Sequence, residues 1–252
     1  MKPPTKLTIE NFTEEPYASI LCYPHANLLE VQNRILELKG IGVETVEFTG
    51  AGSAANVPVL GKGYVGIVVI AHKGGERLAL KMRRLDGGRD NFFHEAEMLQ
   101  KANTIQVGPK FIAVTKNFLL SQLVDGPFLA DWLEKHKEKN AFNRVLLDIL
   151  EQCWRLDQTG IDHGELSKAP RHLLIDKTGK PFIVDFETAS IQRRVANVTS
   201  VCQYLFAGNS IIPHMVHEVI GEKNMIQLVE VLRNYKKDPN RYNFEVLLQT
   251  CL

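Results

Sequence analysis

No apolar run in this 252-residue chain comes near the roughly 20 residues that a helix needs to cross a bilayer. A signal-peptide pattern is also missing, because residues 1–6 are polar and proline-rich. The formal net charge is only +1, which provides no general attraction to nucleic acid or to anionic membranes. We therefore expect a cytoplasmic protein with no membrane partner, and nucleic-acid binding is not indicated.

Paired cysteines are lacking as well. The four cysteines, Cys22, Cys153, Cys202 and Cys251, lie far apart and form no C-x-x-C pair. This spacing predicts reduced thiols, with neither a zinc site nor a disulfide framework. With 44% hydrophobic and 23% charged residues, the chain has the composition of an ordinary globular protein, without internal repeats or low-complexity segments.

The first half of the chain is rich in strand patterns. Residues 57–70 and 78–82 predict two strands joined by a Lys-Gly-Gly turn, and residues 111–114 and 117–124 predict a second hairpin. Between the hairpins, residues 91–102 have the periodicity of a helix. Antiparallel pairing is the natural arrangement for these strands.

The second half of the chain has mostly helical patterns. Residues 129–134 and 141–159 predict helices, and the tail, residues 198–252, predicts two or three more. Short strands are expected only at 173–176 and 181–185. Strands followed by helices predict an α+β fold with segregated elements.

These patterns divide the chain into three segments. Residues 1–56 are expected to form an N-terminal extension, with a helix at 28–38 and a strand at 43–48, packed on the rest of the fold. Residues 57–122 are expected to form a β-rich lobe, and residues 123–252 a helical one.

A glycine-rich segment carries the first chemical signal. Gly61-Lys62-Gly63-Tyr64-Val65-Gly66-Ile67-Val68 fits the pattern G-x-G-x-x-G-x-V. A dinucleotide fingerprint would open a helix, whereas the β-branched run after Gly66 predicts a second strand. In such a strand–loop–strand context, glycines let backbone N–H groups approach a triphosphate. We predict that Gly61, Gly63, Gly66 and Val68 bind a nucleotide.

A lysine and a glutamate form the second and third signals. Lys81 ends an apolar strand one hairpin beyond the glycine loop, from where its ammonium would reach the α- and β-phosphates. Glu95 shares a helix face with Phe92 and Leu99, which would turn it toward the sheet. We expect Glu95 to pair with Lys81, and Glu97 to face water.

Two acidic motifs complete the set. Asp162-His163-Gly164-Glu165-Leu166 is followed, after a strand–turn–strand, by Ile183-Val184-Asp185-Phe186-Glu187. In a kinase-type site, one acidic residue orients or deprotonates the acceptor hydroxyl. A second, at a strand end, holds magnesium against the phosphates. Two acids presented from adjacent strand ends suit that division.

In their order and spacing, these motifs resemble the protein-kinase superfamily. The resemblance is greatest to the small atypical kinases of the RIO and piD261 kind, and to predicted archaeal serine/threonine kinases with an HGELS loop. It covers about residues 57–189. It implies a bilobal kinase-like fold that binds ATP and Mg²⁺ between a β-rich lobe and a reduced helical lobe.

The resemblance also implies roles for single residues. The three glycines would cover the phosphates, Lys81 would bind them and Glu95 would anchor Lys81. Gln122 and Leu123 would form the adenine-binding hinge, and Asp185 would be the principal magnesium ligand.

The sequence departs from the family pattern at several positions. Glu165 stands where the family usually has aspartate, and His172 stands near the position of the asparagine that binds a second magnesium. Neutral histidine is a poor ligand for this hard cation, so Glu187 is a further candidate metal ligand beside Asp185 and His172. No Ala-Pro-Glu segment follows Asp185, so a long activation loop is not expected.

The leading prediction is an atypical serine/threonine protein kinase that transfers the γ-phosphate of ATP to a protein hydroxyl, its own included. Glu165 would be the base or the group that orients the acceptor. Two alternatives stay open. The first is a nucleotide-binding pseudokinase adaptor, which is compatible with Glu165 and His172 at two catalytic positions. The second is a small-molecule kinase, because the His163-Gly164-acid loop also resembles that of aminoglycoside and choline phosphotransferases. The acceptor and the oligomeric state are not specified by these residues.

Overall fold

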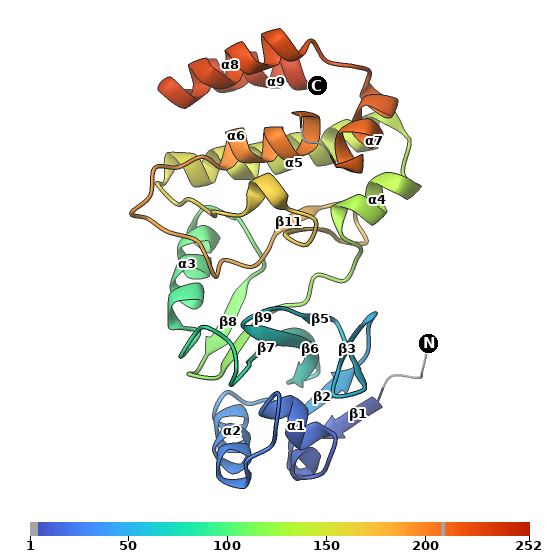
Figure 1. The fold of residues 1–252 in the computed structure, drawn as a ribbon, viewed down its shortest axis with the longest axis vertical. Helices are drawn as coiled ribbons and strands as arrows, with labels where there is room; N and C mark the ends of the chain where they lie inside the picture. The colour runs from blue at the N-terminus through green and yellow to red at the C-terminus, as the bar shows by residue number, and fades with distance from the viewer. Residues whose placement is uncertain (1–4, 208–209) are drawn as a thin grey trace. The chain divides into compact units, whose positions relative to one another are not determined.

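The chain divides into two compact units in a computed structural model that describes residues 5–207 and 210–252. The first unit runs to Glu97 and includes Lys110–Leu123, and the second comprises Met98–Pro109 and Val124–Leu252. The first unit carries an antiparallel sheet, and most helices belong to the second (Figure 1). The predicted α+β class is therefore confirmed.

The main sheet lies in the first unit. Its strands pair antiparallel in the order β1-β2-β6-β7-β9-β8, and β5 pairs with β6. A separate hairpin joins β3 to β4. The strands are β1 (Thr5–Thr8), β2 (Thr45–Phe48), β3 (Gly52–Ala54), β4 (Val57–Val59), β5 (Gly61–Lys62), β6 (Gly66–Lys73), β7 (Glu76–Arg83), β8 (Phe111–Val114) and β9 (Phe118–Gln122).

The central hairpin sets the register of the residues expected to form the site. Strands β6 and β7 are joined by Gly74 and Gly75, which both have positive φ, as a type I′ two-residue turn requires. With this turn, Val68 lies directly opposite Lys81. Residues directly opposite in an antiparallel pair project on the same face, so Val68 and Lys81 are side-by-side neighbours.

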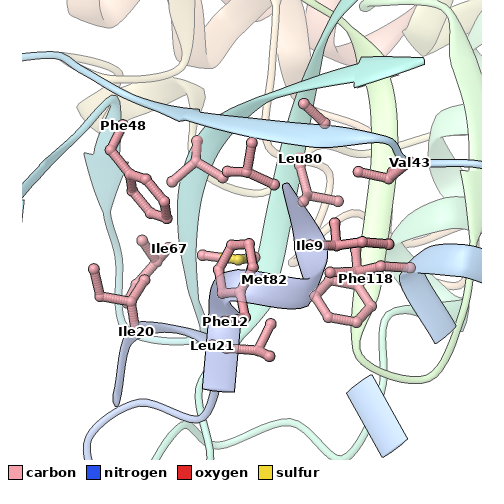
Figure 2. Packing of buried hydrophobic residues seen from close by; sticks show 14 of the residues in the cluster. Ile9, Phe12, Ile20, Leu21, Val43, Phe48, Ile67, Leu80, Met82 and Phe118 are labelled. Carbon is pink, nitrogen blue, oxygen red and sulfur yellow. The ribbon is translucent and has the colours of Figure 1, made fainter. Parts of the chain in front are cut away.

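The N-terminal segment packs on this sheet through short helical elements. These are η1 (Ile9–Thr13), α1 (Tyr17–Leu21) and α2 (Leu28–Gly40). In Figure 2, Phe12 and Leu21 lie beside Met82, and Ile9 lies beside Phe118. All of these side chains are buried in one apolar cluster, so the segment supplies part of the core on which the sheet depends.

Several short elements differ from the predicted ones. One helix was expected before residue 42, and the structure adds β1, η1 and α1. Each of these has four or five residues, too few to display a clear period. The single strand predicted over residues 57–70 is divided into β4, β5 and β6, because the chain turns at the glycine loop.

The second unit is built around helix α5, which is buried along one side and contacts α6 and β11. Helix α3 begins in the first unit and ends in the second. The remaining elements are α3 (Phe93–Thr104), α4 (Leu129–Lys135), α5 (Lys139–Gln158), η2 (Leu166–Lys168), β10 (Leu173–Ile175), β11 (Pro181–Ile183), α6 (Asn197–Cys202), the π-helical turn η3 (Gln203–Ala207), α7 (Ile211–Ile220), α8 (Met225–Lys237) and α9 (Arg241–Cys251).

The tail contains more helices than predicted. Among the described residues after 196 there are four α-helices, where two or three were expected. Ser210, Asn224 and Asn240 each accept a hydrogen bond from the first turn of the following helix. Such N-caps restart a helix at points that hydrophobic periodicity alone does not mark. No described helix of the chain is both long and apolar enough to span a membrane.

Candidate functional site

An ion pair in the first unit joins the sheet to helix α3. The Nζ atom of Lys81, on β7, lies 2.9 Å from each carboxylate oxygen of Glu95. The two side chains are only 14% and 7% exposed, so water screens their attraction weakly. Phe92 and Ala96 pack with Val65 and turn this face of the helix toward the sheet. The expected contact between Lys81 and Glu95 is confirmed, and Glu97 is exposed as expected.

Gly66 is required by the path of the Lys81 side chain. A Cβ atom at Gly66 would lie 2.9 Å from Cγ of Lys81 and 3.2 Å from the carbonyl oxygen of Met82. Real Cβ contacts are essentially never shorter than 3.0 Å, so any larger residue would displace the lysine. The glycine therefore allows Lys81 to lie flat along the strand on its way to Glu95.

Contacts within the folded protein do not require glycine at the other two positions of the loop, Gly61 and Gly63. A Cβ atom at Gly61 would meet nothing within 4 Å, and one at Gly63 would meet only the Gly66 carbonyl oxygen at 3.7 Å. Neither glycine has positive φ. Packing and backbone conformation would thus admit larger residues, and glycine there leaves the backbone open to another molecule.

Arg84 and Tyr23 hold the glycine loop in place, and the sequence reasoning missed both. Arg84 donates to the Gly63 carbonyl oxygen at 2.6 Å and to both oxygens of Asp86 at 2.9 and 2.8 Å. Its guanidinium holds the pKa of Asp86 below the usual value. Lys62 donates to the Tyr23 hydroxyl. The register of β6 and β7 puts Arg84 opposite the loop, which is the signal that could have revealed it.

The remaining nucleotide-binding candidates of the first unit lie along the same strands. Val68 is half-buried next to Lys81. Gln122 ends β9, and its backbone N–H donates to the Lys110 carbonyl oxygen at 2.8 Å. Leu123 follows and is half-buried. The roles of Gln122 and Leu123 in adenine binding stay predictions.

In the second unit, the loop from Asp162 to Glu165 is fixed by long-range contacts. The Asp162 carboxylate accepts from Nε of Arg193 at 2.9 Å and from the backbone N–H of Ala196 at 3.1 Å. A Cβ atom at Gly164 would lie 2.5 Å from Nη2 of Arg193, so the arginine passes directly over this glycine, whose φ is +91°. Arg193 also donates to the Thr188 carbonyl oxygen at 2.7 Å. Sequence reasoning missed Arg193, because nothing in the local pattern marks such a contact.

His163 is completely buried in this loop. Its backbone N–H donates to Asn197 at 2.8 Å, and its Nε2 lies 3.0 Å from the Val184 carbonyl oxygen. Burial lowers the pKa of His163 to about 4, with the neighbouring His172 adding to the effect. The imidazole is thus neutral near pH 7, and Nε2 is the donor to Val184.

Glu165 and His172 form a pair at the end of the loop. Nε2 of His172 lies 3.1 Å from a carboxylate oxygen of Glu165. The Glu165 side chain is 41% exposed and that of His172 only 15%. The Glu165 side chain is therefore accessible to solvent, while His172 contacts one of its carboxylate oxygens.

Asp185 and Glu187 follow strand β11. Each places a carboxylate oxygen within 4.8 Å of the other's, a spacing at which two carboxylates can share one cation. Asp185 has φ +67°, in the left-handed region that costs energy for residues other than glycine. Such strain concentrates at functional sites, where it holds a side chain in a required direction. The carboxylates of both residues suit Mg²⁺, whereas the imidazole of His172, already paired, suits it less.

These features define an α+β protein with a glycine loop next to a buried lysine–glutamate pair in one unit, and an acidic loop and strand end in the other. No protein-family model matches the chain. Over 117 residues it is 30% identical to the uncharacterized protein MJ1211 of Methanocaldococcus jannaschii, a match that covers 46% of this chain and 98% of that protein. The chain therefore belongs to the same family as this archaeal protein, whose name assigns no activity.

Proposed function

We propose that this protein is an ATP-dependent phosphotransferase of the protein-kinase type, with a kinase-like bilobal fold. One Mg²⁺–ATP engages the glycine loop and Lys81 of the first unit and Asp185 of the second. The γ-phosphate passes to a hydroxyl of a protein, which includes the chain itself. We also propose that the chain is related to the atypical kinases of the RIO and piD261 kind.

The buried pair of Lys81 and Glu95 beside the glycine loop is the observation that carries the proposal. A buried ion pair rarely adds to stability, since desolvating both charges costs about as much as their attraction returns. Its value lies in fixing an ammonium at one place. Lys81 lies next to a loop in which packing does not require glycine at residues 61 and 63. Glycine there lets backbone N–H groups approach a triphosphate closely.

The second unit supplies groups that suit the chemistry of transfer. In phosphoryl transfer the protein mainly positions the reactants and stabilises charge. Asp185, held in a left-handed conformation, and Glu187 are suited to bind Mg²⁺ against the phosphates. The partly exposed carboxylate of Glu165 is suited to orient an acceptor hydroxyl and accept its proton.

Transfer of radioactive phosphate from γ-labelled ATP in the presence of Mg²⁺ tests this function. We expect label in the protein itself or in added protein substrates, and a loss of about 100-fold or more on Lys81→Met or Asp185→Asn. Lys116→Met and Asp131→Asn are matched controls, because both residues are exposed and away from these motifs. Equal labelling by Asp185→Asn and the wild type would contradict the proposal.

The labelling experiment, together with thermal unfolding, separates the two alternatives. Mg²⁺–ATP would raise the unfolding temperature of a pseudokinase, but no phosphate would be transferred. One observation favours this alternative: His172 already occupies one oxygen of Glu165. A small-molecule kinase would consume ATP only when sugars, nucleosides or amino alcohols are supplied, and would leave proteins unlabelled.

A further inference from the structure

His172 is held by backbone hydrogen bonds and by a contact with a buried aromatic ring. Its backbone N–H donates to Ala169 at 3.3 Å, and its carbonyl oxygen accepts from Val184 at 2.9 Å. Its ring meets that of His163 edge to face, with centroids 5.5 Å apart. His163 is itself fully buried and packs on Phe186. Because the His172 side chain is only 15% exposed and meets this buried ring, the imidazole has little freedom to turn.

The polar atoms of this imidazole have unequal surroundings. Nε2 faces Glu165 at 3.1 Å, whereas Nδ1 is buried and has no hydrogen-bond partner among the described residues. A proton on Nδ1 would leave a buried N–H without an acceptor and would set the lone pair of Nε2 against the Glu165 carboxylate, which can only accept. The tautomer that carries its proton on Nε2 avoids this repulsion and donates to the Glu165 carboxylate.

Glu165 needs such a partner because of its length. A glutamate side chain has one more rotatable bond than an aspartate, so it reaches further forward and has more conformational freedom. With 41% of the side chain exposed, no dense packing restrains it. A hydrogen bond from a rigid imidazole selects one carboxylate position, which an orienting group in phosphoryl transfer requires.

We propose that His172 is a positioning residue that fixes the carboxylate of Glu165 for the acceptor hydroxyl, and is not a ligand of a second cation. This proposal rests on the proposed phosphotransferase function. The two departures from the kinase pattern, glutamate for aspartate and histidine for asparagine, are then one paired change. Metal binding is left to the carboxylates of Asp185 and Glu187.

Two substitutions of His172 distinguish the effect of its N–H donor from the effect of its size and shape. Gln has an N–H donor the same number of bonds from the backbone as Nε2, whereas Leu fills similar space without a donor. We expect His172→Leu to lower kcat about 10- to 100-fold, and His172→Gln to restore most of it. The KM for ATP and the Mg²⁺ concentration for half-maximal rate should stay unchanged. Exposed His214, replaced by Leu, is the matched control.

A cation ligand would behave differently. If His172 bound metal, His172→Leu would raise the Mg²⁺ concentration needed for half-maximal rate, and excess Mg²⁺ would recover kcat. That result, or an unchanged kcat in His172→Leu, would overturn the proposal. Thermal unfolding of each variant shows whether a lower kcat reflects a loss of folded protein.

A double substitution tests whether His172 acts only through Glu165. If it does, His172→Leu has no further effect on kcat once Glu165→Gln is present. Losses that multiply would mean that His172 acts independently, contrary to the proposal. The function itself fails in a distinguishable way, because the wild type would then transfer no phosphate. In that event the nitrogen-15 chemical shifts of His172, compared with those in Glu165→Gln, still test the pairing, and identical shifts would refute it.

Discussion

The three glycines of the loop show that one sequence motif can have more than one physical cause. Gly66 is required because the Lys81 side chain lies against it, and this requirement is internal to the folded protein. Gly61 meets nothing within 4 Å, so the folded protein alone gives no reason for it. Stability measurements can separate these two cases, whereas the motif alone cannot.

Gly66→Ala should destabilise the protein, and Gly61→Ala should not. The new methyl group at residue 66 would lie 2.9 Å from Cγ of Lys81, and such overpacking costs about 1–3 kcal/mol. At residue 61 the methyl group meets open space, and the less flexible unfolded chain favours folding by up to about 1 kcal/mol. Denaturant-induced unfolding of both variants measures this difference. Equal destabilisation by the two substitutions would mean that Lys81 does not follow the path described.

The contact between Lys81 and Glu95 could be predicted because both partners follow local rules. The Gly74-Gly75 turn fixes the strand register, and the helix period fixes the direction of Glu95. Tyr23 and Arg193 could not be predicted in the same way. Their partners lie on other segments, and only the folded chain brings these segments together.

At the scale of elements, helix α2 is joined to the sheet by a buried arginine. The guanidinium of Arg34 donates to the carbonyl oxygens of Leu21 at 2.7 Å and Arg83 at 2.6 Å. It also donates to Asn117 at 3.0 Å and to Glu30 at 2.7 Å. One side chain thus connects α1, α2, the end of β7 and the turn before β9.

Arg34→Met should therefore destabilise the first unit strongly. Methionine fills similar space but removes the donor to the buried carbonyl oxygens of Leu21 and Arg83, and each such loss costs about 1–3 kcal/mol. Lys39→Met, on the same helix, is the matched control. Lys39 pairs with Glu10 at 3.1 Å, but both side chains are about half exposed, so the loss of this pair should destabilise the protein far less than the loss of Arg34. Thermal and urea unfolding give the comparison. A small effect of Arg34→Met would show that these contacts are not required.

The elements that the sequence predicted are those with a clear period or turn. Helix α2, helix α5 and the β6–β7 hairpin lie close to their predicted ranges. The missed β1 has four residues that alternate only between half-buried and exposed, so its hydrophobic signal is weak. Arg34 is another example, since a charged residue in a helix is expected to face solvent, whereas tertiary hydrogen bonds allow its complete burial.

At the scale of the whole molecule, strands and helices are segregated along the chain. The sequence predicted this segregation because alternating and helical periods occupy different halves. The order of the strands could not be predicted in this way. Strand β2 pairs with β6, and β1 with β2, so the N-terminal residues extend the same sheet that carries Lys81. No local pattern specifies this pairing, because it depends on which apolar faces fit together.

The proposed function predicts that one ATP molecule protects segments of both units from hydrogen exchange. With a non-hydrolysable ATP analogue and Mg²⁺, we expect slower amide exchange at residues 61–66 of the first unit and 183–187 of the second, because bound ligand suppresses local opening. Lys81→Met should weaken protection in both segments together, since both depend on one binding event. Exposed Lys116→Met should leave protection as in the wild type. Protection confined to one unit would mean that the glycine loop and Asp185 do not serve the same nucleotide.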